Sequence, residues 1–157
     1  MQYDTEDVIK NCFGGAYTKD NPCVVIKISN KQISNNLKQY GLCGAKSTKE
    51  IPYILNNKEL EKHYIRGIID GDGYIRSTES GFGVVGSLNI LQYIKNFIQN
   101  NITDVSNNNI KSHDKIYKFA IQSAGKTKLI LDYLYKDATI YLDRKYKLYL
   151  EEYCIKN

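Results

Sequence analysis

Histidine and closely spaced cysteine are both scarce in this sequence. Its 157 residues include two histidines, and its four cysteines, Cys12, Cys23, Cys43 and Cys154, stand far apart. Zinc sites need pairs of cysteine or histidine at short spacing, and no such pair occurs. No Ser-His-Asp or Cys-His catalytic set is evident either. We therefore expect free, mostly packed thiols rather than disulfides or a zinc site.

Long apolar runs are also missing. A membrane-spanning helix needs a run of about 18 apolar residues, and none occurs, nor does an N-terminal signal peptide. The expected location is intracellular, in the cytoplasm of a host cell or the matrix of an organelle, with no membrane partner. The length suits a single domain with a real core.

Neither sign of charge dominates. The net charge is +5, and basic residues exceed acidic ones by seven to five in residues 1–56 and by fifteen to twelve in residues 57–157. This balance allows nucleic-acid binding without requiring it. The distribution is more informative, because one segment has five lysines and a single acid, Asp114, although a solvated loop and strand would look the same. Those lysines are Lys111, Lys115, Lys118, Lys126 and Lys128.

Helical and strand patterns alternate along the chain, which predicts an α+β fold. An N-terminal strand at residues 24–28 precedes a helix carrying Ile33 and Leu37, capped by Ser29 or Asn30. Further helices are predicted from residue 58 to the acids near residue 72, after a cap at Ser87, over residues 129–135 and over residues 141–153. A hairpin is predicted at residues 74–79 and 82–85, and another strand at residues 117–121.

Residues 64–73 read Tyr-Ile-Arg-Gly-Ile-Ile-Asp-Gly-Asp-Gly and end the central helix. Asn56 and Glu59 form a candidate capping box at its start. Apolar residues on two flanks predict a helix packed between other elements. Gly67 in its interior costs about 1 kcal/mol against alanine, which is tolerated where another backbone comes close.

Two carboxylates lie at the C-terminal end of this helix, where negative charge is unfavourable. The C-terminus of a helix has partial negative charge, so Asp70 and Asp72 predict a positive group nearby. A bound cation would meet this need, since Mg²⁺ takes one or two carboxylates and completes its shell with water and substrate phosphate. Gly71 and Gly73 allow a sharp turn and the approach of a bulky substrate.

The stretch resembles the LAGLIDADG motif of homing endonucleases, most closely over residues 67–73, with Arg66 where the pattern has alanine. The resemblance implies a Mg²⁺-dependent DNA endonuclease of a phage or other mobile element, involved in intron or intein mobility, that hydrolyses phosphodiesters at a specific duplex site. It implies that Asp72 binds the metal, with help from the Gly71 carbonyl. Asp70, Gly67 and Gly73 would form the structural helix end.

The same resemblance predicts an αββαββα unit with a saddle-shaped antiparallel sheet. Residues 58–157 resemble a complete repeat, whereas residues 1–50 resemble a partial first repeat without its motif helix. Cutting both DNA strands takes two metal-bearing helix ends, and this chain has one. Three arrangements are open: a homodimer, an N-terminally truncated chain that works with a complementary motif-bearing subunit, or a degenerate relative that binds DNA or another protein, as an inhibitor or regulator, without cleaving.

Candidate DNA contacts follow from the strand pattern. Side chains alternate along a strand, and a two-stranded ribbon fits the major groove. Lys126, with Lys128 as its substitute, is the candidate for stabilising charge that develops in the reaction, because family members often place a lysine near that strand end. The predicted DNA-binding residues are Arg76, Thr78, Ser80, Lys118 and Gln122.

Two nucleotide-binding patterns are matched only in part. Residues 81–86 read G-x-G-x-x-G, but no buried strand precedes them and no suitable acid follows, so the glycines are expected to shape the hairpin. Residues 120–127 approach a phosphate-binding loop, but Ala120 replaces its first glycine.

Overall fold

The computed structural model describes residues 29–40, 50–76, 81–114 and 116–155. The predicted strand at residues 24–28, and the residues Thr78, Ser80 and Lys115, lie outside the described residues. By its internal contacts the chain divides into two units, residues 1–36 and 37–157. Across the boundary runs α2 (Lys31–Gln39). Its N-cap is Asn30, one of the two predicted caps, whose side chain accepts a hydrogen bond from the Ile33 N–H at 3.0 Å.

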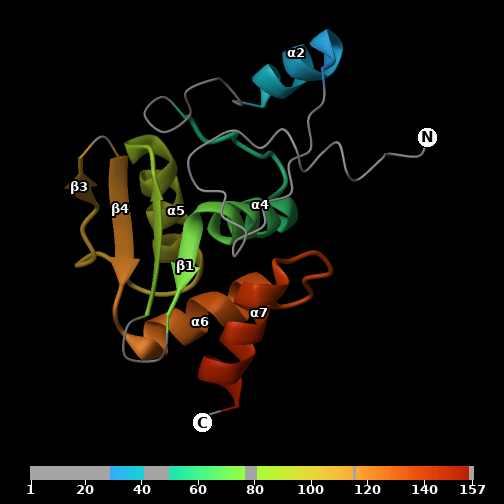
Figure 1. The fold of residues 1–157 in the computed structure, drawn as a ribbon. Coiled ribbons are helices and arrows are strands. Elements are labelled where there is room, and N and C mark those ends of the chain that lie inside the picture. The colour runs from blue at the N-terminus through green and yellow to red at the C-terminus, as the bar shows by residue number, and fades with distance from the viewer. Residues whose placement is uncertain (1–28, 41–49, 77–80, 115, 156–157) are drawn as a thin grey trace, which may run out of the picture. The chain divides into compact units, whose positions relative to one another are not determined.

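The second unit is an α+β fold with one four-stranded antiparallel sheet (Figure 1). Most predicted helices and strands are confirmed to within a few residues. The last predicted helix is shorter, because its second half is a π-helical turn. In chain order the elements are α4 (Lys58–Asp72), β1 (Gly73–Ile75), β2 (Phe82–Gly86), α5 (Leu88–Asn101), β3 (Lys111–His113), β4 (Ile116–Ile121), α6 (Ala124–Tyr135), α7 (Asp143–Tyr149) and the turn η1 (Leu150–Cys154).

Short polar side chains begin these helices. Asn57, rather than the predicted Asn56, caps α4 and accepts a hydrogen bond from the Glu59 N–H at 2.9 Å. Ser87 caps α5 as predicted, and Ser123 caps α6 in the same way. In each case the side-chain oxygen satisfies an N–H group that the first helical turn leaves without an intrahelical partner.

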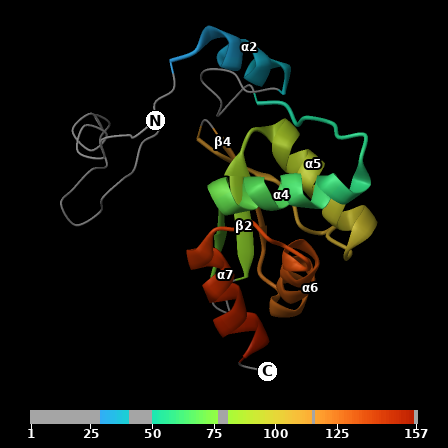
Figure 2. The ribbon, with the colours of Figure 1, turned by 90° about the vertical axis from the view of Figure 1, so that its right-hand side faces the viewer.

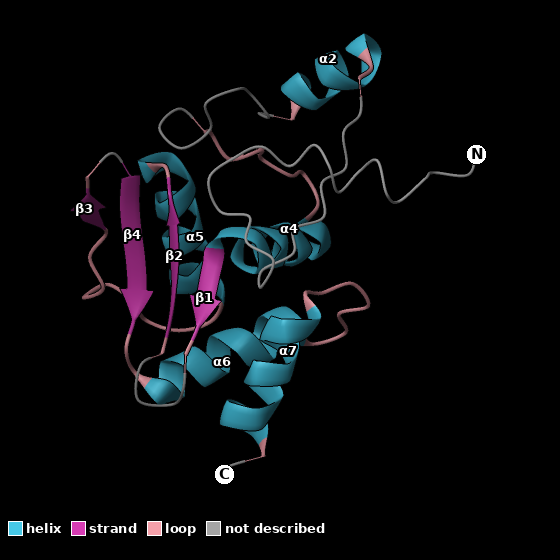
Figure 3. Ribbon diagram, viewed as in Figure 1, coloured by secondary structure: helices cyan, strands magenta, loops and turns pink. Residues whose placement is uncertain are grey.

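The strands lie in the order β1-β2-β4-β3. Helices cover one face of the sheet, and Figure 2 shows α4 crossing in front of the strands. The apolar side chains of α4, α5 and α6 meet those of β2 and β4 in one core. The opposite face, which we call the open face, has no described helix over it (Figure 3). Its residues are set by the register, in which Tyr74 is paired with Gly83, and Gly83 with Ala120.

The two predicted apolar flanks of α4 are buried to different extents. Ile65 and Ile69 lie in the core, whereas on the other flank Tyr64 and Ile68 are half-buried against it and Leu60 is 51% exposed. No described atom lies within 4 Å of where a Cβ on Gly67 or Gly71 would stand. The backbone neighbour predicted for Gly67 is therefore absent from the described part of the chain, and we call this side of α4 the glycine stripe.

A second cluster of buried side chains attaches the C-terminal segment to the sheet. Ile75 of β1 packs with Leu131 and three tyrosines of α6, α7 and η1. The Tyr153 hydroxyl donates a hydrogen bond to the Arg76 carbonyl at 2.7 Å. Cys154, next in sequence, is a free and exposed thiol. The other cysteines, Cys12, Cys23 and Cys43, lie outside the described residues. Among the described helices, none has the length and apolarity needed to cross a membrane.

Candidate functional site

The positive group expected at the end of α4 is present, and it is a lysine. Lys145 of α7 is 2% exposed. Its ammonium donates hydrogen bonds to the carbonyls of Ile69 at 2.6 Å and Asp70 at 2.7 Å, and to that of Gly73. Three donors therefore meet three acceptors where the helix has partial negative charge. The end of α4 by itself does not require a metal ion.

Burial lowers the pKa of Lys145, and the neighbouring charge of Arg144 lowers it further. The carboxylates of Asp70 and Asp72 act in the opposite direction, so both lie close enough to interact with the ammonium. The three carbonyl acceptors explain how a charged group is tolerated here, because a buried ammonium needs every N–H partnered.

Asp70 faces inward, toward the C-terminal helices. One oxygen of its carboxylate accepts a hydrogen bond from the Tyr135 hydroxyl at 2.8 Å, and the other accepts one from the Leu142 N–H at 3.2 Å. Burial and this negative neighbour raise the pKa of Tyr135, so its hydroxyl keeps its proton and remains a donor. Asp70 thus connects α4 with α6 and with the start of α7.

Asp72 differs from Asp70 both in its exposure and in its hydrogen bonding. It is exposed, it ends α4, and its carboxylate has no hydrogen bond or ion pair with another described residue. The chain turns directly from Asp72 into β1. Gly73 makes that turn possible, since a Cβ there would lie 2.5 Å from the Ile69 carbonyl oxygen. Asp72 is therefore available to a ligand at the start of the edge strand.

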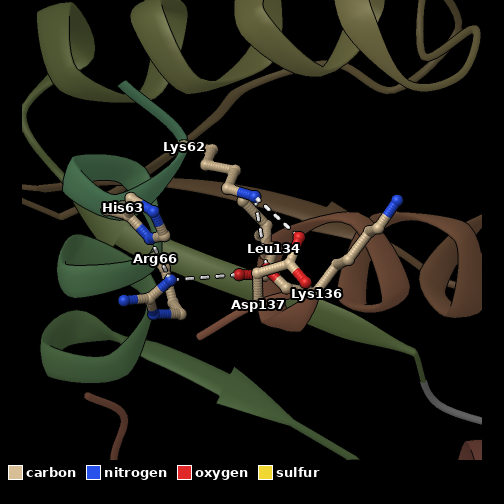
Figure 4. Close-up of polar contacts among 6 residues, drawn as sticks. All are labelled: Lys62, His63, Arg66, Leu134, Lys136 and Asp137. Atoms are coloured by element: carbon tan, nitrogen blue, oxygen red, sulfur yellow. Dashed lines mark hydrogen bonds and ion pairs between the residues drawn. The ribbon is translucent and has the colours of Figure 1, made fainter. Parts of the chain in front are cut away.

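Arg66, where the motif has alanine, is buried and supports α6 (Figure 4). Its guanidinium donates hydrogen bonds to the carbonyls of Leu134 at 3.2 Å and Ile140 at 3.1 Å, and it contacts the Nδ1 atom of His63. Lys62, one turn earlier, donates to the Lys136 carbonyl at 3.2 Å. Two cations of α4 thus satisfy carbonyls at the C-terminal end of α6, where positive charge is favourable.

The open face has an aromatic ring between two cations. The Tyr74 side chain crosses the sheet above Gly83, where any Cβ would overlap the ring. The Arg76 guanidinium lies 4.9 Å from the ring centroid, and the Lys118 ammonium 5.2 Å from it. Such cation–π contacts favour particular rotamers. Tyr74 thereby orients both cations on the side of the sheet that the helices leave uncovered.

Lys118 lies at the same level of the sheet as the start of β1. Gly73 is paired with Val84, and the next pair along β2 and β4 joins Val85 to Lys118. Strands are about 4.8 Å apart, so the two spacings from β1 to β4 put Lys118 about 10 Å from the start of β1. Lys118 was predicted as a DNA contact, and the register adds that it lies level with the point where α4 ends and β1 begins.

The other predicted basic residues lie elsewhere. Lys126 follows the far end of β4 in α6, and its ammonium donates to the Asp104 carbonyl at 2.6 Å. Lys128 forms an ion pair with Asp132 at 2.8 Å. The structure does not bring either lysine to Asp72. Gln122 follows β4 and is exposed on the Lys118 side.

A divalent cation has one candidate carboxylate here. No group of three or more His, Cys, Asp or Glu side chains that could enclose a metal occurs among the described residues. Mg²⁺ does not need such a cage, because it keeps several waters and takes one or two carboxylates together with substrate phosphates. An exposed aspartate beside a backbone carbonyl fits that donor set.

Sequence reasoning did not identify Lys145 or Tyr74 as site residues. Lys145 lies 73 positions after Asp72 in a tyrosine-rich segment that also contains Arg144 and Lys147. Its spacing resembles that of any solvated lysine. Tyr74 could have been identified, because alternation places it between Asp72 and Arg76, and Gly83 leaves room for its ring.

Comparison with protein-family models, with curated proteins and with solved structures gave no match for this chain.

Proposed function

We propose that this protein is a LAGLIDADG-type DNA endonuclease subunit, which binds duplex DNA through the open face of its sheet and hydrolyses a phosphodiester beside Asp72. The observation that carries the proposal is the exposed carboxylate of Asp72 at the end of a rigid helix, at the edge of a sheet face that presents Arg76 and Lys118. A carboxylate binds a cation, and the basic groups bind the phosphates around it.

Asp72 and the Gly71 carbonyl would hold Mg²⁺. When bound, the metal supplies an activated water and stabilises the leaving oxygen. Lys145 and Gly73 keep the end of α4 in one conformation, which fixes the direction of Asp72 relative to β1. Arg76 and Lys118 would orient the DNA, with Arg76 suited to guanine edges and Lys118 to phosphates.

The element order of the second unit, α4-β1-β2-α5-β3-β4-α6, supports the proposal, because the resemblance predicts αββαββα. The glycine stripe supports it as well. Gly67 and Gly71 are four residues apart on an exposed side of α4, and small residues at that spacing let two helices approach closely. A second α4, from another copy or from a different subunit, would bring a second carboxylate for the other DNA strand.

The second candidate is a degenerate relative that binds DNA without cutting it. Lys145 favours this alternative, because it already supplies the positive charge at the end of α4. A positive group so near Asp72 weakens the attraction of that carboxylate for a divalent cation.

Cleavage separates the two candidates. The purified chain is incubated with a supercoiled plasmid library that contains random duplex inserts, with and without Mg²⁺, and nicked and linear products are counted. The endonuclease proposal expects Mg²⁺-dependent products that Asp72→Asn abolishes while duplex binding persists. Glu151→Gln, an equal charge change on η1, should leave them intact. Salt-sensitive binding without any product would support the degenerate relative, and absence of duplex binding would overturn both.

A further inference from the structure

Lys111 and Lys118 lie directly opposite each other on β3 and β4. Lys118 faces the open side of the sheet with Tyr74, and residues opposite each other across two strands share a face, so both ammonium groups lie on that side. Like charges in this position destabilise a sheet. Neither lysine forms an ion pair with a carboxylate of the described residues. The folded chain thus places two lysines without a described carboxylate partner opposite each other on one face, where an anion would be attracted to both.

The two lysines also line one pocket of about 410 Å³. Besides them, its polar lining consists of the amides of Asn107, Asn109 and Gln122 and the hydroxyl of Ser123, together with Asn108. The Asn108 amide donates to the Ala120 carbonyl at 3.1 Å and holds the loop against β4. Among the described residues, no acidic side chain lines the pocket. We call it the β3–β4 pocket.

We infer that the β3–β4 pocket binds one backbone phosphate of the DNA, held jointly by Lys111 and Lys118. This inference rests on the proposed function and extends it, since it names Lys111 as the partner of Lys118 and places the phosphate in a defined pocket. Two ammonium groups select an anionic group over a base edge, which has no net charge. Amide and hydroxyl donors can complete the shell of the phosphate oxygens.

The position of the pocket gives the site a second anchor on DNA. Lys118 lies between Tyr74 and the pocket, about 10 Å across the sheet from the start of β1. A phosphate held there fixes the duplex at one side of the open face while Asp72 addresses the scissile bond at the other. Backbone contacts of this kind set register and orientation but carry no sequence information.

The test measures duplex binding by fluorescence anisotropy at a series of KCl concentrations. A labelled duplex of mixed sequence is titrated with the wild type, Lys111→Gln, Lys118→Gln and the double variant. Each neutralised phosphate contributes about 0.9 to the slope of log K against log salt. Because the two lysines share one phosphate, each single variant should lower the slope by less than half of this amount, and the double variant by about 0.9.

Lys147→Gln on α7 is the control, since it changes the net charge equally but lies away from the sheet. It should leave the slope unchanged. The double variant should unfold at the same temperature as the wild type or higher, because the cross-strand repulsion is gone.

Three results would overturn the inference while leaving the proposed function intact. They are an unchanged slope in the double variant, full and additive losses in the two single variants, and an equal loss in Lys147→Gln. If the wild type binds no duplex at all, the proposed function fails, and this inference with it.

Discussion

Asp70 and Asp72 lie two positions apart in one helix, yet their surroundings have little in common. Asp70 is 9% exposed and holds Tyr135 and Leu142 with its two oxygens. Asp72 is exposed and forms no hydrogen bond or ion pair with another described residue, although its charge acts on Lys145. The first belongs to the junction of α4, α6 and α7, and the second to the edge of the open face. The two acids therefore differ in role, because Asp70 stabilises the fold whereas Asp72 is left exposed to solvent.

The largest expected effect concerns the junction. Lys145→Met removes the ammonium and leaves the carbonyls of Ile69, Asp70 and Gly73 without their donor. We expect a loss of about 3 kcal/mol in the free energy of unfolding, measured by urea denaturation. Lys147→Met on the same helix, which is exposed, should change stability by less than about 0.5 kcal/mol. Equal effects at the two positions would contradict the assigned role of Lys145.

Replacing each acid in turn with asparagine tests directly whether Asp70 and Asp72 contribute differently to stability. Asp70→Asn places an amide donor against the Tyr135 hydroxyl or the Leu142 N–H, and should cost about 1–2 kcal/mol of stability. Asp72→Asn should stay within about 0.5 kcal/mol, because no described contact is lost. Urea denaturation of the two variants side by side tests this. If Asp72→Asn is the more destabilising change, the division of roles is wrong.

Gly67→Ala tests the glycine stripe. In the isolated chain it should raise the free energy of unfolding by about 0.5–1 kcal/mol, because alanine is the better helix former and no described atom opposes its Cβ. Gly73→Ala, by contrast, meets the Ile69 carbonyl and should be destabilising. Thermal unfolding measures both. If Gly67→Ala is more stable yet loses DNA cleavage, another helix packs on the stripe in the active assembly.

The smallest effect is a dependence on pH. Burial lowers the pKa of His63, and the charges of Arg66 and Lys62 lower it further, while Asp137 partly opposes them. The folded state therefore favours the neutral ring, whose Nδ1 contacts the Arg66 guanidinium. This stability is present above the unfolded pKa of 6.5 and is lost as pH falls below it. Urea midpoints between pH 7.5 and pH 5 should fall in the wild type and fall less in His63→Gln.

Local sequence patterns predicted much of the fold. Serine and asparagine caps, apolar periodicity and turn glycines located the helices and most strands, because these signals act within a few residues. The glycines at 81 and 83 also behaved as expected of a hairpin. Gly81 adopts φ of 66°, and Gly83 makes room for Tyr74. The error at the α4 cap, Asn56 instead of Asn57, reflects two adjacent residues with the same chemistry.

The candidate site could be predicted only where it depends on residues that are close together in the sequence. Alternation along the strand predicted Arg76 on the same face as Tyr74, and the Tyr74 ring contacts both Arg76 and Lys118. Asp72 ends α4 and is not part of the strand register. Lys126 could not be evaluated in this way, since only the packing of α6 decides that its ammonium reaches the Asp104 carbonyl. Lys111 and Lys118 lie opposite each other because β3 pairs with β4. The sequence alone gives no register for that pairing.

Local sequence is enough to predict which acids end α4 and which side chains follow them along β1, because spacing within a helix or strand is set by backbone geometry. The contacts of each acid depend on how the helices pack. Lys145, Tyr135 and Leu142 come from segments more than sixty residues away in the chain. Their arrival depends on the packing of α6 and α7, which no local pattern specifies.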